Sequence, residues 1–255
     1  MAQSVRPART VEGPVFILPT WAVLSVDVMR AFMTGGGLGI QGGHEIVLPG
    51  QKMIRLFSRK LRIALRDIHP WGHISLASSY IGYSPFYKLT YREVKTWTEE
   101  DNRIAPHALF SLTELKRYLK KVKGRYQILW PDHAIEGTDE SFVVGEIERE
   151  SAYTWNKGHR PHSDSNSGFI ENDGASTRLD LQLKCRGVTT LVVWGITGDV
   201  CAGLTALHGK KLGFDVYFVT DLSPCISEEG RDSMYEQLIA AGVHLITSDQ
   251  LRAAA

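Results

Sequence analysis

Apolar residues fall in six short runs along the chain, and most of these runs are separated by helical patterns. The runs are rich in β-branched or aromatic residues and are too short for independent helices. A short continuous apolar run is typical of a strand that is buried on both faces of a parallel sheet. The predicted strands cover residues 21–26, 61–65, 126–129, 190–194, 215–219 and 243–246.

Two helical patterns between these runs are clear because a glycine follows each of them. Residues 200–212 precede Gly213 and residues 231–241 precede Gly242, and a glycine just past the last turn is a usual helix stop. Strand and helix therefore alternate. This order predicts a three-layer α/β/α fold with a mostly parallel six-stranded sheet and right-handed crossovers.

Two stretches break the alternation. Residues 1–14 are polar and punctuated by proline and glycine, which predicts a flexible N-terminal tail before one domain over residues 15–255. Residues 80–124 open with aromatic residues and continue into a basic amphipathic helix. We interpret them as an inserted segment or lid with a solvated basic face; a membrane-surface or partner-binding helix is the alternative for the basic part.

The charge balance narrows the class of partner. Lys and Arg total 29 against 28 Asp and Glu, so the net charge of +1 gives no electrostatic basis for binding nucleic acid or an anionic membrane. The odd number of cysteines, three, argues against a disulfide framework and for a reducing compartment. No apolar run reaches the roughly 18 residues of a membrane span. We expect a cytoplasmic protein with a small-molecule ligand, and the sequence leaves a homo-oligomer open.

A carboxylate and several imidazoles follow two of the predicted strands. Asp67 and His69 lie two residues apart, His73 follows, and His133 comes after a different strand. Because ligands of open parallel sheets bind beyond the carboxyl ends of the strands, these side chains can meet at one ion. Asp with two or three His suits zinc, iron(II) or manganese. The alternative is that these histidines shape a turn or lie satisfied in the core.

A cysteine nucleophile is expected at Cys201, which follows the glycine-containing loop GITGDV and opens a predicted helix. A helix N-terminus lowers the pKa of a thiol and offers backbone N–H groups to a developing oxyanion. Cys185 and Cys225 lack that setting and are expected to be structural. The alternative for Cys201 is a small buried hydrophobic residue.

Two further residues complete a candidate catalytic group. Asp27 ends the first predicted strand and can accept the thiol proton, and Lys157 can keep an Asp–Cys pair in its charged form. By spacing alone, Lys157 is expected to be a surface lysine, because no pattern places it in the crevice.

Seven segments between Trp21 and Thr247 carry a family resemblance, in the order VDVMRAF, GGGLGIQGGHEIV, DIHPWGHISLASS, WPDHAIEGT, NKG, DSNSGF and WGITGDVCAGLTALHGKKLGFDVYFVTD. The chain resembles the nicotinamidase/pyrazinamidase branch of the isochorismatase-like cysteine hydrolases. That resemblance implies a catalytic triad of Asp27, Lys157 and Cys201, with nicotinamide as the substrate and a place in NAD salvage.

The resemblance also implies the rest of the site. The implied metal ligands are Asp67, His69, His133 and, as a fourth or variable ligand, His73; zinc is the first expectation and iron or manganese the alternatives. Phe32 and Trp130 match the aromatic residues that sandwich the substrate ring. A cis peptide between Ile196 and Thr197 is implied, with the N–H groups of Thr197 and Cys201 as the oxyanion hole. The rival hypotheses are another amidase or hydrolase of this fold and a catalytically silent binding protein.

Overall fold

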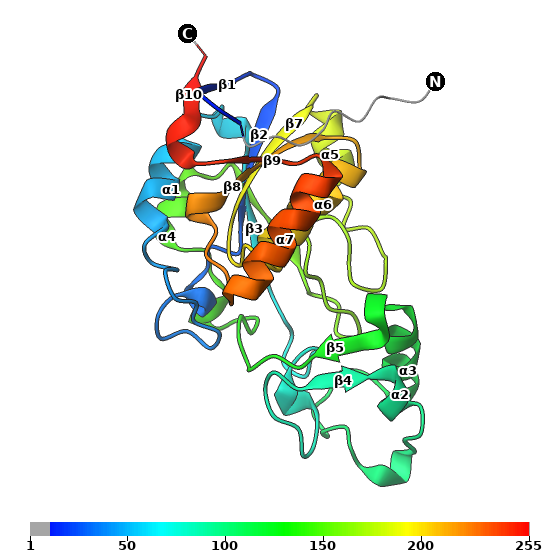
Figure 1. Ribbon diagram of the computed structural model, residues 1–255. Helices are drawn as coiled ribbons and strands as arrows, with labels where there is room; N and C mark the ends of the chain where they lie inside the picture. Colours follow the sequence, from blue (N-terminus) through cyan, green and yellow to red (C-terminus); the bar gives the residue numbers. More distant parts are fainter. Residues whose placement is uncertain (1–10, 255) are drawn as a thin grey trace, which may run out of the picture.

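The computed structural model describes residues 11–254, and its centre is a six-stranded sheet in which every neighbouring pair of strands is parallel (Figure 1). The predicted fold class is confirmed. The strands, in their order across the sheet, are β6 (Tyr153–Lys157), β3 (Arg62–Asp67), β2 (Trp21–Val26), β7 (Thr190–Gly195), β8 (Asp215–Val219) and β9 (His244–Ile246).

Helices cover both faces of this sheet, which is why its two central strands, β2 and β7, are buried along their whole length. Two helices pack on one face and three on the other (Figure 1). The first group is α1 (Val47–Ile54) and α4 (Gly145–Glu150), and the second is α5 (Leu179–Cys185), α6 (Cys201–Lys211) and α7 (Glu228–Ala241).

A glycine allows α1 to approach the sheet closely. A Cβ atom built on Gly50 would lie 2.1 Å from the ring of Trp194, which is fully buried on β7. Glycine inside a helix costs about 1 kcal/mol relative to alanine. The tight contact with the indole ring explains why a residue with a side chain cannot replace it without moving the helix.

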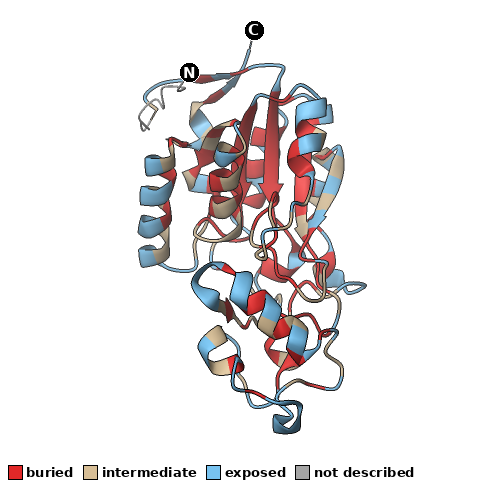
Figure 2. Cartoon of the chain, turned by 90° about the vertical axis from the view of Figure 1, so that its right-hand side faces the viewer, coloured by how far each residue is buried: buried red, intermediate tan, exposed pale blue. Residues whose placement is uncertain are grey.

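The inserted segment forms a small subdomain with its own apolar core, below the central sheet in Figure 2, where the carboxyl ends of the strands point toward it. Its core includes Leu89, Leu115, Leu119 and Leu129, all fully buried. Its helix α3 begins after Ser111, whose side chain accepts a hydrogen bond from the Glu114 N–H in a capping box. The regular elements are β4 (Lys88–Thr90), α2 (Tyr91–Val94), α3 (Leu112–Lys121) and β5 (Tyr126–Ile128).

One strand assignment was wrong, although the number of strands was right. The run at 126–129 forms β5, which pairs antiparallel with β4 in the subdomain and not with the central sheet. The sixth central strand is β6, which was not predicted. It is an edge strand whose exposure alternates between partly buried and exposed until the buried Lys157, so it lacks the continuous apolar run on which the prediction depended.

The remaining elements are short. β1 (Val15–Ile17) pairs in parallel with β10 (Leu251–Ala253), which brings the two ends of the described chain together. Residues 1–10 of the predicted tail lie outside the described residues. No helix within residues 11–254 is long and apolar enough to cross a membrane. Single-turn 3₁₀ helices lie at Arg30–Phe32, Arg59–Leu61, Ala77–Ser79, Glu99–Asp101, Lys123–Arg125, Asp139–Ser141, Thr220–Leu222 and Ser248–Gln250.

Candidate active site

A pocket of about 370 Å³ lies beyond the carboxyl ends of the central strands. Parallel strands deliver side chains from distant parts of the sequence to this one edge. Seven of the residues singled out from the sequence line it, namely Phe32, Asp67, His69, Trp130, His133, Thr197 and Cys201.

Lys157 is buried beneath this pocket and joins two carboxylates. Its Nζ lies 2.9 Å from Asp27 Oδ2 and 2.9 Å from Asp67 Oδ1, and it also lies 3.6 Å from Cys201 Sγ. The expectation of a surface lysine was therefore wrong: Lys157 is 2% exposed, because β6 pairs with β3 in a register that puts Lys157 beside Asp67. Burial alone would lower the pKa of Lys157, but the two carboxylates raise it well above its usual value, so the amine stays charged.

Cys201 is the first residue of α6, at the junction that the sequence predicted. Removal from water nevertheless raises the pKa of its thiol well above the usual value, despite the opposing effect of Lys157. The expected lowering by the helix N-terminus is outweighed. Burial also raises the pKa of Asp27 to about 6, although Lys157 opposes the shift. Near neutral pH the group consists of a thiol beside an ionised carboxylate, which is the arrangement of a nucleophile with its base.

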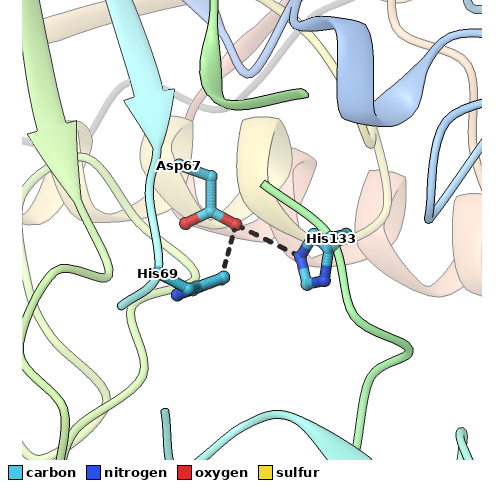
Figure 3. A group of neighbouring side chains, drawn as sticks. All are labelled: Asp67, His69 and His133. Carbon is cyan, nitrogen blue, oxygen red and sulfur yellow. Dashed lines mark hydrogen bonds and ion pairs between the residues drawn. The ribbon is translucent and has the colours of Figure 1, made fainter. Parts of the chain in front are cut away.

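A second cluster of side chains lies on the side of Asp67 that faces away from Lys157. Side chains from the end of β3 and from the 130–135 segment converge on one point, as Figure 3 shows for Asp67, His69 and His133. Asp67 Oδ2 lies 3.1 Å from His69 Nε2 and 3.5 Å from His133 Nε2. All three residues are buried, and one ligand atom from each lies within 4.8 Å of the others.

The hydrogen bonds of the two imidazoles fit a metal ion. His69 Nδ1 lies 2.9 Å from the Gly158 carbonyl and His133 Nδ1 lies 2.8 Å from the Pro131 carbonyl. A carbonyl only accepts, so each Nδ1 carries a proton, and in the neutral imidazole each Nε2 has a lone pair that faces the Asp67 carboxylate. A lone pair on an imidazole nitrogen repels a nearby carboxylate oxygen. The repulsion is relieved when a cation lies between the two groups or when one of them is protonated. The chemistry and geometry of these donors therefore fit one divalent ion.

His73 is close to this cluster but is directed elsewhere. Its ring stacks on His69 with 4.4 Å between the centroids. Its Nδ1 lies 2.8 Å from Ser75 Oγ, and its Nε2 lies 2.9 Å from the Arg160 carbonyl and 3.1 Å from the Ser163 carbonyl. The structure thus brings Asp67, His69 and His133 together and gives both nitrogens of His73 hydrogen-bond partners.

Aromatic and backbone groups form the rest of the wall. Phe32 is 4% exposed and contacts the edge of the His133 ring, with 5.5 Å between the centroids. Trp130 lines the pocket after β5, and the Ile196–Thr197 peptide bond is cis, as the resemblance implied.

Three residues of one loop that contribute to the site were missed, although the loop itself was quoted for the resemblance. Asp164 and Asn166 line the pocket, and the Ser165 carbonyl accepts a hydrogen bond from Lys157 Nζ at 3.0 Å. An acidic residue among small polar ones gives only a weak signal, since such stretches usually form solvated turns. Leu38 and Ile226 also line the pocket, and no sequence signal identifies them.

Comparison with known proteins agrees with this geometry. Residues 127–250 match the Isochorismatase domain. A solved structure described as a nicotinamidase and pyrazinamidase of Acinetobacter baumanii superposes with a TM-score of 0.74 at 26% identity, over 91% of this chain and 98% of the other. The chain is therefore similar to proteins of the isochorismatase-like superfamily.

Two further similar proteins extend the comparison. The nicotinamidase of Acinetobacter baylyi is 28% identical over 230 residues, which cover 89% of this chain and 92% of the relative. A pyrazinamidase of Pyrococcus horikoshii, solved in complex with zinc, has the same fold, with a TM-score of 0.63 at 24% identity over 90% of this chain and 99% of the other.

Proposed function

We propose that this protein is a nicotinamidase, which hydrolyses nicotinamide to nicotinate and ammonia. The observation that carries the proposal is that one pocket joins a cysteine, its carboxylate and its lysine to an Asp–His–His cluster through the shared contacts of Lys157. Two relatives named as nicotinamidases match this chain over about nine-tenths of its length.

The proposed reaction uses a covalent intermediate. Asp27 accepts the proton of Cys201 as Sγ attacks the amide carbon, and the N–H groups of Thr197 and Cys201 stabilise the oxyanion. The proton passes from Asp27 to the amide nitrogen, the C–N bond breaks and ammonia leaves. Water then attacks the thioester and the C–S bond breaks; one proton of the water returns to Sγ, and the other leaves when the product ionises to nicotinate. Two lower barriers replace one high barrier.

Lys157 stays protonated throughout, because the two carboxylates hold its pKa high. Its charge keeps Asp27 ionised despite burial and opposes the cost of forming the Cys201 thiolate. Phe32 and Trp130 both line the pocket, and we propose that they stack on the two faces of the pyridine ring, so that the amide carbon faces Sγ.

The proposed metal ligands are Asp67, His69 and His133, whose donor atoms fit a divalent transition ion, zinc first. A bound ion would supply a Lewis acid beside the ring, to which the pyridine nitrogen of the substrate could coordinate. We propose that His73 supports the ring of His69 by stacking and holds the 160–163 backbone.

The test is hydrolysis of three flat amides by the metal-loaded protein. Nicotinamide and pyrazinamide carry a ring nitrogen meta to the carboxamide, whereas benzamide has the same shape without it. We expect ammonia release from the first two, with kcat/KM for benzamide lower by about 100-fold, because proximity is lost. No hydrolysis of nicotinamide would exclude the activity. Equal values for benzamide would retain an amidase but exclude recognition through the ring nitrogen.

The pH dependence tests the role of Asp27. Its pKa of about 6 means that the carboxylate, the form that accepts a proton, is lost as pH falls below that value. We expect kcat/KM to fall about tenfold per pH unit below pH 6, as one essential base requires. Metal content measured on the same samples separates this effect from loss of the ion. A flat profile to pH 5 at constant metal content would exclude Asp27 as the base.

A further inference from the structure

A chain of buried hydrogen bonds runs from the subdomain to the catalytic lysine. Its first member is Tyr118 on α3, whose hydroxyl donates to Gln127 Oε1 on β5. Gln127 Nε2 donates to Asp164 Oδ2 at 2.8 Å and to the Ile128 carbonyl at 2.7 Å. Tyr118, Gln127 and Asp164 are each no more than 3% exposed.

The chain continues from Asp164 to Lys157 through one residue. Asp164 Oδ1 accepts a hydrogen bond from the Ser165 N–H at 2.8 Å, and the Ser165 carbonyl accepts one from Lys157 Nζ at 3.0 Å. Lys157 Nζ also donates a hydrogen bond to Cys201 Sγ at 3.6 Å, and it forms ion pairs with Asp27 and Asp67. The Ser165 carbonyl is the backbone acceptor that helps to orient the ammonium group toward Cys201 and the two carboxylates.

These hydrogen bonds restrict the position of the buried Asp164 carboxylate and of its loop. A buried carboxylate is strongly destabilised when it lacks a donor, and hydrogen bonds to charged groups are stronger than those between neutral groups. Within this series of hydrogen bonds, the side-chain amide of Gln127 donates to Asp164. Gln127 lies on β5, which belongs to the subdomain. The position of the 163–166 loop thus depends on residues outside the central sheet.

We propose that Gln127 and Asp164 are positioning residues, through which the inserted subdomain holds Lys157 against Cys201 and Asp27. This inference rests on the proposed function, since it assigns the subdomain a role in that same reaction. The subdomain is then part of the catalytic unit and not only a wall over the pocket.

The principal experiment exchanges donor and acceptor along this chain. Gln127→Glu removes the amide donor and places two carboxylates together, and Asp164→Asn weakens the contact to Ser165. Each single variant should lower kcat for nicotinamide by about 10- to 100-fold, with KM within about threefold, because a small misplacement of Lys157 affects the chemical step. The double variant Gln127→Glu/Asp164→Asn restores the contact with reversed polarity and should recover at least about tenfold of the loss.

A matched pair of tyrosines separates positioning from simple destabilisation. Tyr118→Phe breaks the hydrogen bond to Gln127. Tyr80→Phe removes a hydroxyl from the same apolar core, where it donates to the Ile74 carbonyl at 2.7 Å. We expect kcat to fall only in Tyr118→Phe, while thermal stability falls by a similar amount in both variants.

The rate at which iodoacetamide alkylates Cys201, followed by peptide mass spectrometry, gives a readout that needs no substrate. We expect the rate to fall about tenfold in Gln127→Glu, because Lys157 then supports the thiolate less well. Unchanged alkylation and unchanged kcat in both single variants would overturn the inference. If the wild type fails to hydrolyse nicotinamide, the proposed function fails, and the alkylation rate alone decides the role of the two residues.

Discussion

The crevice and the subdomain bury polar groups of different kinds. The crevice buries three charged residues, Asp27, Asp67 and Lys157. In the subdomain core the buried polar residues are neutral, as Tyr80 and Gln127 are, and the basic residues of its helix α3 lie on its outer face or are partly buried.

This difference shows that the desolvation cost of buried charges is concentrated in the crevice. Desolvation of an ion destabilises a fold by several kcal/mol unless partners compensate it, and a buried ion pair is often no more stabilising than an apolar one. A network of three buried charges is therefore poor evidence of stability and good evidence of chemistry. Neutral groups with complete hydrogen bonds carry the smaller cost, which suits a supporting role.

The largest expected effect lies in the crevice. Cys201→Ala should lower nicotinamide hydrolysis by at least about 10⁴-fold, because loss of a nucleophile removes the covalent route. Fold and metal content should not change, since the neighbouring charges remain paired. Cys185→Ala and Cys225→Ala are the matched controls and should keep activity within about twofold. Substantial turnover by Cys201→Ala would show that the buried charges serve another purpose.

Much of the fold could be predicted from the sequence because buried parallel strands leave a strong local pattern. β2 and β8 have the predicted boundaries, and the order of alternating strands and helices was sufficient for the layers. β6 could not be found in this way, because an edge strand has one solvent-facing side and its pattern resembles that of a loop. The run that became β5 was apolar enough for a central strand, but a tertiary partner, β4, determined its sheet.

Individual residues of the candidate site could be predicted from the sequence, but the contacts between them could not. Asp67 and Cys201 stand next to strong local features, a strand end and a helix start. The burial of Lys157 depends on the register between β6 and β3, which no local pattern specifies. The roles suggested for Gln127 and Asp164 arise from a contact between segments that are 37 residues apart. Such contacts are set by packing and become visible only in three dimensions.

A smaller effect is expected at Gly158, where the two clusters meet. Its φ is +68°, and a Cβ atom there would lie 2.7 Å from Asp67 Oδ1 and 2.7 Å from His69 Cε1. Gly158→Ala should therefore displace both proposed ligands and weaken metal binding by about 10- to 100-fold, as for other residues that orient ligands. Metal titration with a competing chelator measures the change.

Gly187→Ala is the matched control for Gly158→Ala. Gly187 has a similar φ of +74°, but a Cβ atom there meets nothing within 4 Å. Both variants should lose about 1 to 2 kcal/mol of stability through backbone strain, and only Gly158→Ala should lose metal affinity. Equal metal affinity in the two variants would show that the proposed ligands do not depend on this close contact.

The smallest expected effect concerns Glu171, a buried carboxylate outside the crevice. It tests whether burial of this charge lowers the stability of the fold, as the comparison implies. Glu171 is 8% exposed, and its Oε2 has no hydrogen-bond partner within residues 11–254. Burial raises its pKa to about 7, although Arg160 opposes the shift. A raised pKa means that the folded protein binds this proton more tightly than the unfolded chain. The stabilisation is complete below about pH 4.5 and is lost as pH rises to 7.

Glu171→Gln is neutral at every pH and should remove this dependence. At pH 5 the variant and the wild type should have similar free energies of unfolding in urea, whereas at pH 8 the variant should be more stable by on the order of 1 to 3 kcal/mol. Glu229→Gln, at an exposed position of α7, should show no such change between the two pH values. A constant difference between wild type and Glu171→Gln at both pH values would mean that the fold accommodates this charge without cost. The contrast between a charged crevice and neutral surroundings would then not reflect an energetic constraint.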